Sequence, residues 1–197
     1  QDDISKYIAF INSLPGNTFK NKVYNVLLAI GLTPEILNAV INNMTDGPTA
    51  ANNNAGQIIA RAENLTGSGT TVRTDTSDRN HPDKYFTLGG TSQTVSYTFN
   101  APKAFSGQLV AYLGKSDNSS SKKIANAISL QLNNSAVTIK DITNKNAGMG
   151  VCGKRTNYFP VVLADINFSA GNNTIKIAGS SEAFNIGGIY VFNKAVI

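Results

Sequence analysis

The stretch TVSYTF, at positions 94–99, decides the fold class of this chain. Its apolar residues alternate one by one with polar residues, which is the period of a strand with one buried and one solvated face. The flanking sequence supports the same fold, because short segments rich in β-branched or aromatic residues recur between turn formers. With no helical period between these segments, we predict an antiparallel β-sandwich.

The predicted strands run from residue 57 almost to the end of the chain and are separated by turn formers such as Gly89-Gly90 and Asn133-Asn134. They comprise residues 57–64, 94–99, 106–113, 127–132, 136–139, 161–168, 174–178 and 188–192. Long polar loops are expected at 67–92, 114–124 and 141–159. On a rigid sandwich, such loops commonly carry the binding residues.

The first 44 residues follow a helical period instead. Apolar residues recur there every three or four positions, which predicts three short amphipathic helices packed as a small bundle. Their apolar stripes comprise Ile4, Tyr7, Ile8, Ile11 and Leu14, then Phe19, Val23, Val26, Leu27 and Ile30, then Ile36, Leu37, Val40, Ile41 and Met44. Residues 45–56 are turn formers and small polar residues. We therefore predict a helical domain at 1–44, a linker at 45–56 and a β-sandwich at 57–197.

The composition limits the possible partners. Hydrophobic residues make up 41% of the chain and charged residues only 15%, so the surface must be polar with little charge. The formal charge of +5 is scattered along the sequence without a basic cluster, so no nucleic-acid partner is predicted. Cys152 is the only cysteine, which leaves no intrachain disulfide and favours a core role. No stretch is apolar for long enough to cross a bilayer, and any signal peptide or lipid anchor is expected outside this sequence.

Six short motifs occur in a fixed order along the β-rich part of the chain. They are RAENLTGSG at 61–69, YFTLGG at 85–90, SYTFNAP at 96–102, LQLNN at 130–134, AGNNTIKI at 170–177 and NIGGIYV at 185–191. Together they resemble the galactose-binding-like jelly roll of carbohydrate-binding module families 6 and 35. The resemblance spans about residues 58–193 and implies a jelly-roll β-sandwich that binds glycans without catalysis.

The predicted helices have no counterpart in those modules. Helices joined to such a sandwich, in a chain rich in asparagine and lysine with a single cysteine, also resemble the mycoplasma haemagglutinin lipoproteins. That second resemblance implies an adhesin at the cell surface or outside the cell, with glycans or glycoconjugates of a host or cell surface as its partners.

The first resemblance implies a sugar site in the apical loops. A sugar offers hydroxyls for hydrogen bonds and C–H groups that pack on an aromatic ring, so a binder needs an aromatic side chain beside amides or charged groups. The chain departs from the family in having no tryptophan. The expected ligand-binding residues are Tyr85, Tyr158 or Phe159, Asn185, Arg155 and Asp83.

The related modules often hold a structural calcium ion, which needs six to eight oxygen ligands. Glu63 stands at one of the matching positions and is the only weak metal candidate. Its same-face neighbour is Arg61, and Gly187 or Gly188 replaces the expected final aspartate. We therefore expect that Arg61 pairs with Glu63 or another acid, that the calcium site is lost, and that no cofactor is needed.

Nothing in the sequence predicts an enzyme. His81 is the only histidine and precedes a proline in a polar loop, and the motifs of nucleophilic, phosphate-binding or metal-dependent catalysis are absent. Asp141 and Asp165 could form a carboxylate pair, but no sequence feature brings them together. The alternatives to a glycan binder are a protein–protein adhesin that uses the sandwich as a scaffold and an accessory module of a glycoside hydrolase.

Overall fold

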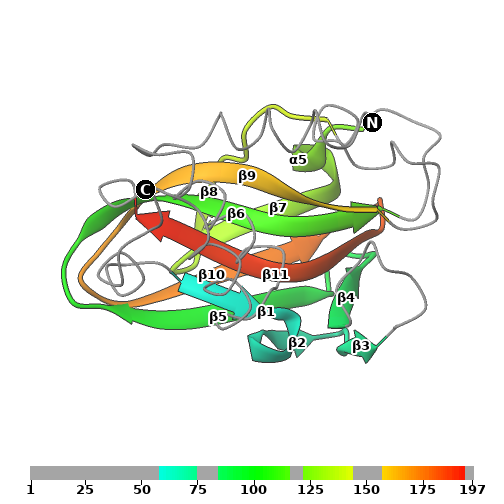
Figure 1. Ribbon diagram of the computed structural model, residues 1–197. Helices are drawn as coiled ribbons and strands as arrows, with labels where there is room; N and C mark the ends of the chain where they lie inside the picture. Colours follow the sequence, from blue (N-terminus) through cyan, green and yellow to red (C-terminus); the bar gives the residue numbers. More distant parts are fainter. Residues whose placement is uncertain (1–57, 75–83, 116–121, 144–156, 194–197) are drawn as a thin grey trace, which may run out of the picture.

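The computed structural model describes residues 58–74, 84–115, 122–143 and 157–193 (Figure 1). These residues form two antiparallel sheets that pack face to face, so this part of the chain is mainly β, as the alternating pattern predicts. The predicted helical domain at 1–44 and the linker at 45–56 lie outside the described residues.

The first sheet has six strands, in the order β3-β4-β11-β6-β9, with β1 paired to β11. Its members are β1 (Ile58–Arg61), β3 (Arg73–Thr74), β4 (Lys84–Leu88), β6 (Phe105–Lys115), β9 (Asn157–Phe168) and β11 (Phe184–Asn193). β4 pairs with the start of β11 and β1 with its later part, while the pairing of β11 with β6 shifts register between Ile186 and Gly188. This irregularity lies between the part of β11 that pairs with β4 and the part that pairs with β1.

The second sheet has five strands, in the order β2-β5-β10-β7-β8. Its members are β2 (Thr66–Ser68), β5 (Thr94–Ala101), β7 (Ile128–Leu132), β8 (Ser135–Val137) and β10 (Gly171–Gly179). The predicted turn at Asn133-Asn134 is confirmed: both residues have positive φ, 50° and 65°, and join β7 to β8 as a two-residue hairpin. Among the described residues no helix is long and apolar enough to span a membrane.

Two predictions about local structure are wrong. The strand expected at 57–64 ends at Arg61, and a 3-10 turn η1 (Ala62–Asn64) follows, because the Asn64 Oδ1 atom accepts a hydrogen bond from the Arg61 amide at 3.2 Å. The loop expected at 67–92 contains β3 and β4 and most of β2. β2 and β3 are short, largely exposed edge strands, so they lack the alternation by which a half-buried strand is recognised.

Smaller differences concern the ends of strands. β6 and β9 extend into the loops expected at 114–124 and 141–159, and a short helix α5 (Ile124–Ala127) precedes β7. The α5 amide of Ile124 donates to the carbonyl of Ile142 at 2.9 Å. That hydrogen bond joins two segments that the sequence analysis places in separate loops.

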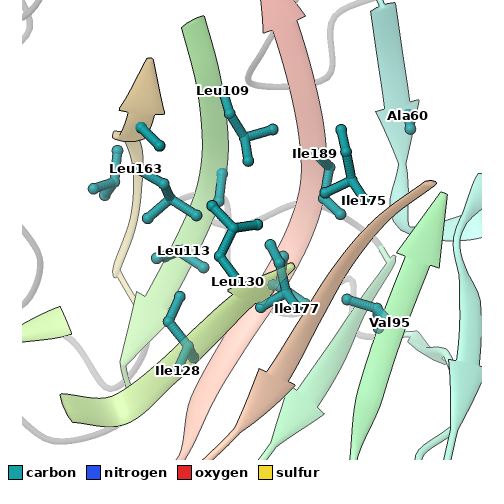
Figure 2. Packing of buried hydrophobic residues seen from close by; sticks show 14 of the residues in the cluster. Ala60, Val95, Leu109, Leu113, Ile128, Leu130, Leu163, Ile175, Ile177 and Ile189 are labelled. Carbon is teal, nitrogen blue, oxygen red and sulfur yellow. The ribbon is translucent and has the colours of Figure 1, made fainter. Parts of the chain in front are cut away.

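The core lies between the two sheets (Figure 2). Leu109, Leu113 and Ile189 from the six-stranded sheet meet aliphatic residues of β5, β7 and β10, and all of them are almost completely buried. An aromatic cluster joins the sheets further along: the ring centroid of Phe168 lies 5.4 Å from that of Phe99 and 4.9 Å from that of Phe105. These distances are those of favourable aromatic pairs, so the core holds both sheets in fixed positions.

Candidate functional site

The outer face of the six-stranded sheet, the face directed away from the core, carries polar side chains at the end where β4 meets β11. On β4, Phe86 and Leu88 are buried in the core, so Tyr85 and Thr87 lie on the outer face. On β11, Phe184 and Ile186 are buried, which directs Asn185 to the same outer face. Tyr85, Thr87 and Asn185 are each about half-buried and therefore accessible to a ligand.

Strand register aligns four positions across this end of the sheet. Asn185 of β11 pairs with Thr87 of β4 on one side and with Gly114 of β6 on the other. Gly114 in turn pairs with Tyr158 of β9. We call these four positions, Thr87, Asn185, Gly114 and Tyr158, the outer row. It brings together segments that are separated by up to 98 positions in the sequence.

Hydrogen bonds fix the polar side chains of the outer row. The Thr87 hydroxyl donates to the Asn185 Oδ1 atom at 2.8 Å, which makes the Nδ2 group the donor end of this amide. The Thr70 hydroxyl donates to the Thr87 carbonyl at 2.9 Å and ties the preceding segment to β4. Gly114, the neighbouring position of the outer row on β6, is buried. An oriented amide on the same face of a sheet as a tyrosine is a combination that can hydrogen-bond a sugar and pack on it.

The predicted site residues divide into two groups. Tyr85, Asn185 and the backbone of Tyr158 lie at one end of the sheet, and Phe159 pairs with Leu113 in the adjacent position of β9. The side chains of Tyr158 and Phe159, and the whole of Asp83 and Arg155, lie outside the described residues. Whether any of these residues contacts a ligand stays a prediction.

Two members of the outer row are absent from the predicted site. Thr87 and Gly114 occur in ordinary strand sequence, with no feature that marks a binding role. Their relevance follows only from the register, which places both beside Asn185. Because register depends on pairing between distant strands, no local pattern could have identified them.

The described residues do not supply a recognisable metal or carboxylate-pair site. Glu63 is exposed on η1, and no group of three histidine, cysteine or acidic residues occurs in the described ranges. Asp141 pairs with Lys123 at 3.0 Å, and Asp165 pairs with Lys140 at 2.9 Å. Each of these two carboxylates therefore has its own lysine partner, an arrangement unlike two carboxylates that share a proton.

The fold is similar to those of solved structures that contain carbohydrate-binding modules. A GH26-CBM35 β-(1,4)-mannanase from Podospora anserina matches 71% of this chain and 28% of its own, with a TM-score of 0.54 and 19% sequence identity. The CBM35 from Cellvibrio japonicus Abf62 matches 70% of this chain and 94% of its own, with a TM-score of 0.50 and 14% identity. The chain thus spans under a third of the mannanase chain but nearly all of the isolated module. No protein-family model and no curated protein sequence matches the chain.

These matches establish the class of fold. The described residues form a β-sandwich of the carbohydrate-binding module kind, as the resemblance in sequence predicts. At identities of 14% and 19% the likeness concerns the fold alone, because one fold supports many functions. A functional assignment must therefore rest on the outer row and its neighbours.

Proposed function

We propose that the chain is a non-catalytic glycan-binding protein whose site is the outer row together with Tyr85. The observation that carries this proposal is the hydrogen bond between Thr87 and Asn185, which orients an amide on the outer face of the sheet, the face on which Tyr85 lies two positions before Thr87. A sugar would donate and accept hydrogen bonds at the amide, and its C–H groups would pack on the Tyr85 ring. Arg155 and Asp83 would supply charged contacts, and Tyr158 or Phe159 a second ring.

Sandwiches of the same fold in modules named for carbohydrate binding support the proposal. A single small site of this kind binds weakly, with a dissociation constant on the order of 0.1 mM, or about −5.5 kcal/mol. Display of many copies would raise the effective affinity. We therefore propose an adhesin or haemagglutinin-type role at the cell surface or outside the cell, for which multivalent contact with a glycan-coated surface is suited.

An accessory module of a glycoside hydrolase is the second candidate. It is favoured by the match to the mannanase, since this chain spans only 28% of that enzyme. The same outer row would then hold the polysaccharide for a catalytic domain elsewhere in a longer chain. Binding of plant cell-wall polysaccharides, with no signal for animal-type glycans, would favour this candidate over the adhesin.

A glycan array with matched variants tests the proposal. Wild-type protein should give signal, and Asn185→Ala and Tyr85→Ala should abolish it without lowering the melting temperature. Tyr85→Phe should retain most of the signal because the ring remains. The control is Asn172→Ala on the other sheet, which also removes an amide that is hydrogen-bonded across strands, to Asn100 at 3.0 Å, and should bind as the wild type does.

Two results would contradict the proposal. Silence of the wild-type protein across a broad array would favour the protein–protein adhesin, in which the sandwich is only a scaffold. Equal signal from Asn185→Ala and Asn172→Ala would show that glycans bind elsewhere on the molecule.

A further inference from the structure

Beyond the outer row, the outer face of the six-stranded sheet has an apolar part on β6 and β11, which is bounded further along β6 by the polar residues Gln108 and Ser106. Along β6, alternate residues such as Leu109 and Leu113 belong to the core cluster, whereas Val110 and Tyr112 point to the opposite side. Val110 is nevertheless 0% exposed and Tyr112 5%. Tyr190 of β11 also lies outside the core cluster and is 1% exposed. We call these three residues, Val110, Tyr112 and Tyr190, the outer apolar strip.

The outer apolar strip is continuous across two strands. Tyr190 pairs with Val110, and Gly188 pairs with Tyr112. The Tyr190 ring lies over Gly188, since a β-carbon added there would come within 2.6 Å of the Tyr190 Cζ atom. Both tyrosines and the valine therefore form one surface. The absence of a side chain at Gly188 makes room for the Tyr190 ring.

The phenol of Tyr190 is removed from water together with its ring. Burial raises its pKa well above the ordinary value, while the charge of Arg61 lowers it by less and that of Glu63 raises it slightly further. The five-stranded sheet cannot provide this burial, because it packs on the inner side of β6 and β11 (Figure 1). Something else must cover the outer apolar strip.

The sequence outside the described ranges offers few candidates for this cover. Residues 45–57, 75–83 and 116–121 contain no large apolar side chain, residues 144–156 offer only Met149, Val151 and Cys152, and residues 194–197 offer only Val196 and Ile197. Residues 1–44, by contrast, carry the three apolar stripes of the predicted helices, which must themselves be buried. The chain also enters the sheet beside the strip, because Ile59 of β1 pairs with Tyr190.

We propose that the outer apolar strip is the docking surface for residues 1–44 of the same chain. The proposal gives the amphipathic N-terminal segment a function that is independent of glycan binding: it closes the second face of the six-stranded sheet. The helical domain and the sandwich would then be one folded unit, with the linker at 45–56 spanning only the distance from the strip to β1.

Nuclear Overhauser contacts in the full chain test this directly. Ring protons of Tyr112 and Tyr190 and the methyl groups of Val110 should show contacts to isoleucine, leucine or valine methyl groups within residues 1–44. Three results would overturn the proposal: contacts from the strip to Met149, Val151, Val196 or Ile197 instead, contacts only between differently labelled copies in a mixed sample, or none from 1–44.

A pair of variants in the N-terminal segment gives an independent readout. Leu27→Glu places a charge in the second apolar stripe, whereas Asn25→Glu adds the same charge at a polar position of that segment. Leu27→Glu should raise nitration of Tyr112 and Tyr190 about tenfold or more, since burying a charge costs more than the 1.4 kcal/mol of a tenfold shift. Asn25→Glu should leave nitration as in the wild type.

Nitration of Tyr85 serves as the internal reference, because that residue is half-buried outside the strip. Equal protection of the strip in both variants would overturn the proposal. If Leu27→Glu also unfolds the sandwich, the Overhauser contacts of the wild-type chain decide the question alone.

Discussion

The outer faces of the two sheets differ in kind. On the five-stranded sheet, the outer face carries a polar ladder in which the hydroxyls of Thr98 and Thr174 lie 2.8 Å apart and Asn100 donates to Asn172 at 3.0 Å. On the six-stranded sheet, the corresponding face is polar at the outer row and again near the start of β6, where the Ser106 hydroxyl donates to the Asn167 Oδ1 atom of β9 at 2.6 Å, and the outer apolar strip lies between these two polar parts. One sheet therefore has a single buried face, whereas part of the other is buried on both. The polar ladder of the five-stranded sheet can therefore face solvent, whereas the outer apolar strip of the six-stranded sheet requires a covering partner.

The largest expected effect on stability comes from removing the Tyr190 side chain of the outer apolar strip. Tyr190→Ala should lower the free energy of unfolding by about 3 kcal/mol, because it removes a fully buried ring and leaves a cavity. Chemical denaturation of the variant and of Thr174→Ala, its counterpart on the polar ladder, measures the difference. A loss no greater than that of Thr174→Ala would contradict the burial of the strip.

A substitution of Gly188, the glycine under the Tyr190 ring, tests the packing of the same strip. Gly188→Ala should cost about 2 kcal/mol, because the new methyl group would displace the Tyr190 ring. Gly90→Ala is the matched control, since a β-carbon there has no neighbour within 4 Å. Thermal unfolding of both variants should show a clear loss for the first and little change for the second. Similar melting temperatures would mean that the ring does not lie over Gly188.

Alkaline pH should weaken the strip. The pKa of Tyr190 is raised by burial, so the folded chain keeps the phenol proton at pH values where the unfolded chain releases it. The associated stability is fully present below about pH 10 and falls by about 1.4 kcal/mol per pH unit above it. The stability difference between wild type and Tyr190→Phe should therefore shift against the wild type by about 1 kcal/mol between about pH 10 and pH 11. Parallel pH curves would contradict a buried phenol.

The smallest effect is expected on the polar ladder. Thr98→Ala should change the free energy of unfolding by only about 0.5 kcal/mol, because its hydroxyl pair with Thr174 is exposed to water. Urea denaturation measures this change. A loss of about 2 kcal/mol or more would indicate that the ladder is covered, as a buried hydrogen bond would be.

The sequence predicts the sandwich well because alternation along strands such as TVSYTF is a local property that burial of one face enforces. It fails at β2 and β3, whose short edge strands are held by pairing with β5 and β4 and not by their own pattern. The outer face of β6 shows a further limit. Val110 and Tyr112 occur within an unbroken apolar run, and such a run cannot state which of its residues face the core and which face another partner.

The candidate site was predictable in part for a similar reason. Tyr85 and Asn185 belong to motifs that resemblance could identify, whereas Thr87 and Gly114 became relevant through the register of β4, β11 and β6. Hydrogen-bond partners across strands depend on that register, so the orientation of the Asn185 amide could not be obtained from composition or spacing.

Chemical-shift mapping with the glycan that binds best on the array tests the central claim most directly, because it asks which outer face holds the ligand. The account predicts that titration of the wild-type chain shifts the backbone amides of Thr87, Gly114 and Asn185 and leaves those of Thr98, Asn172 and Thr174 unchanged. Shifts confined to the polar ladder, with the outer row unaffected, would contradict it.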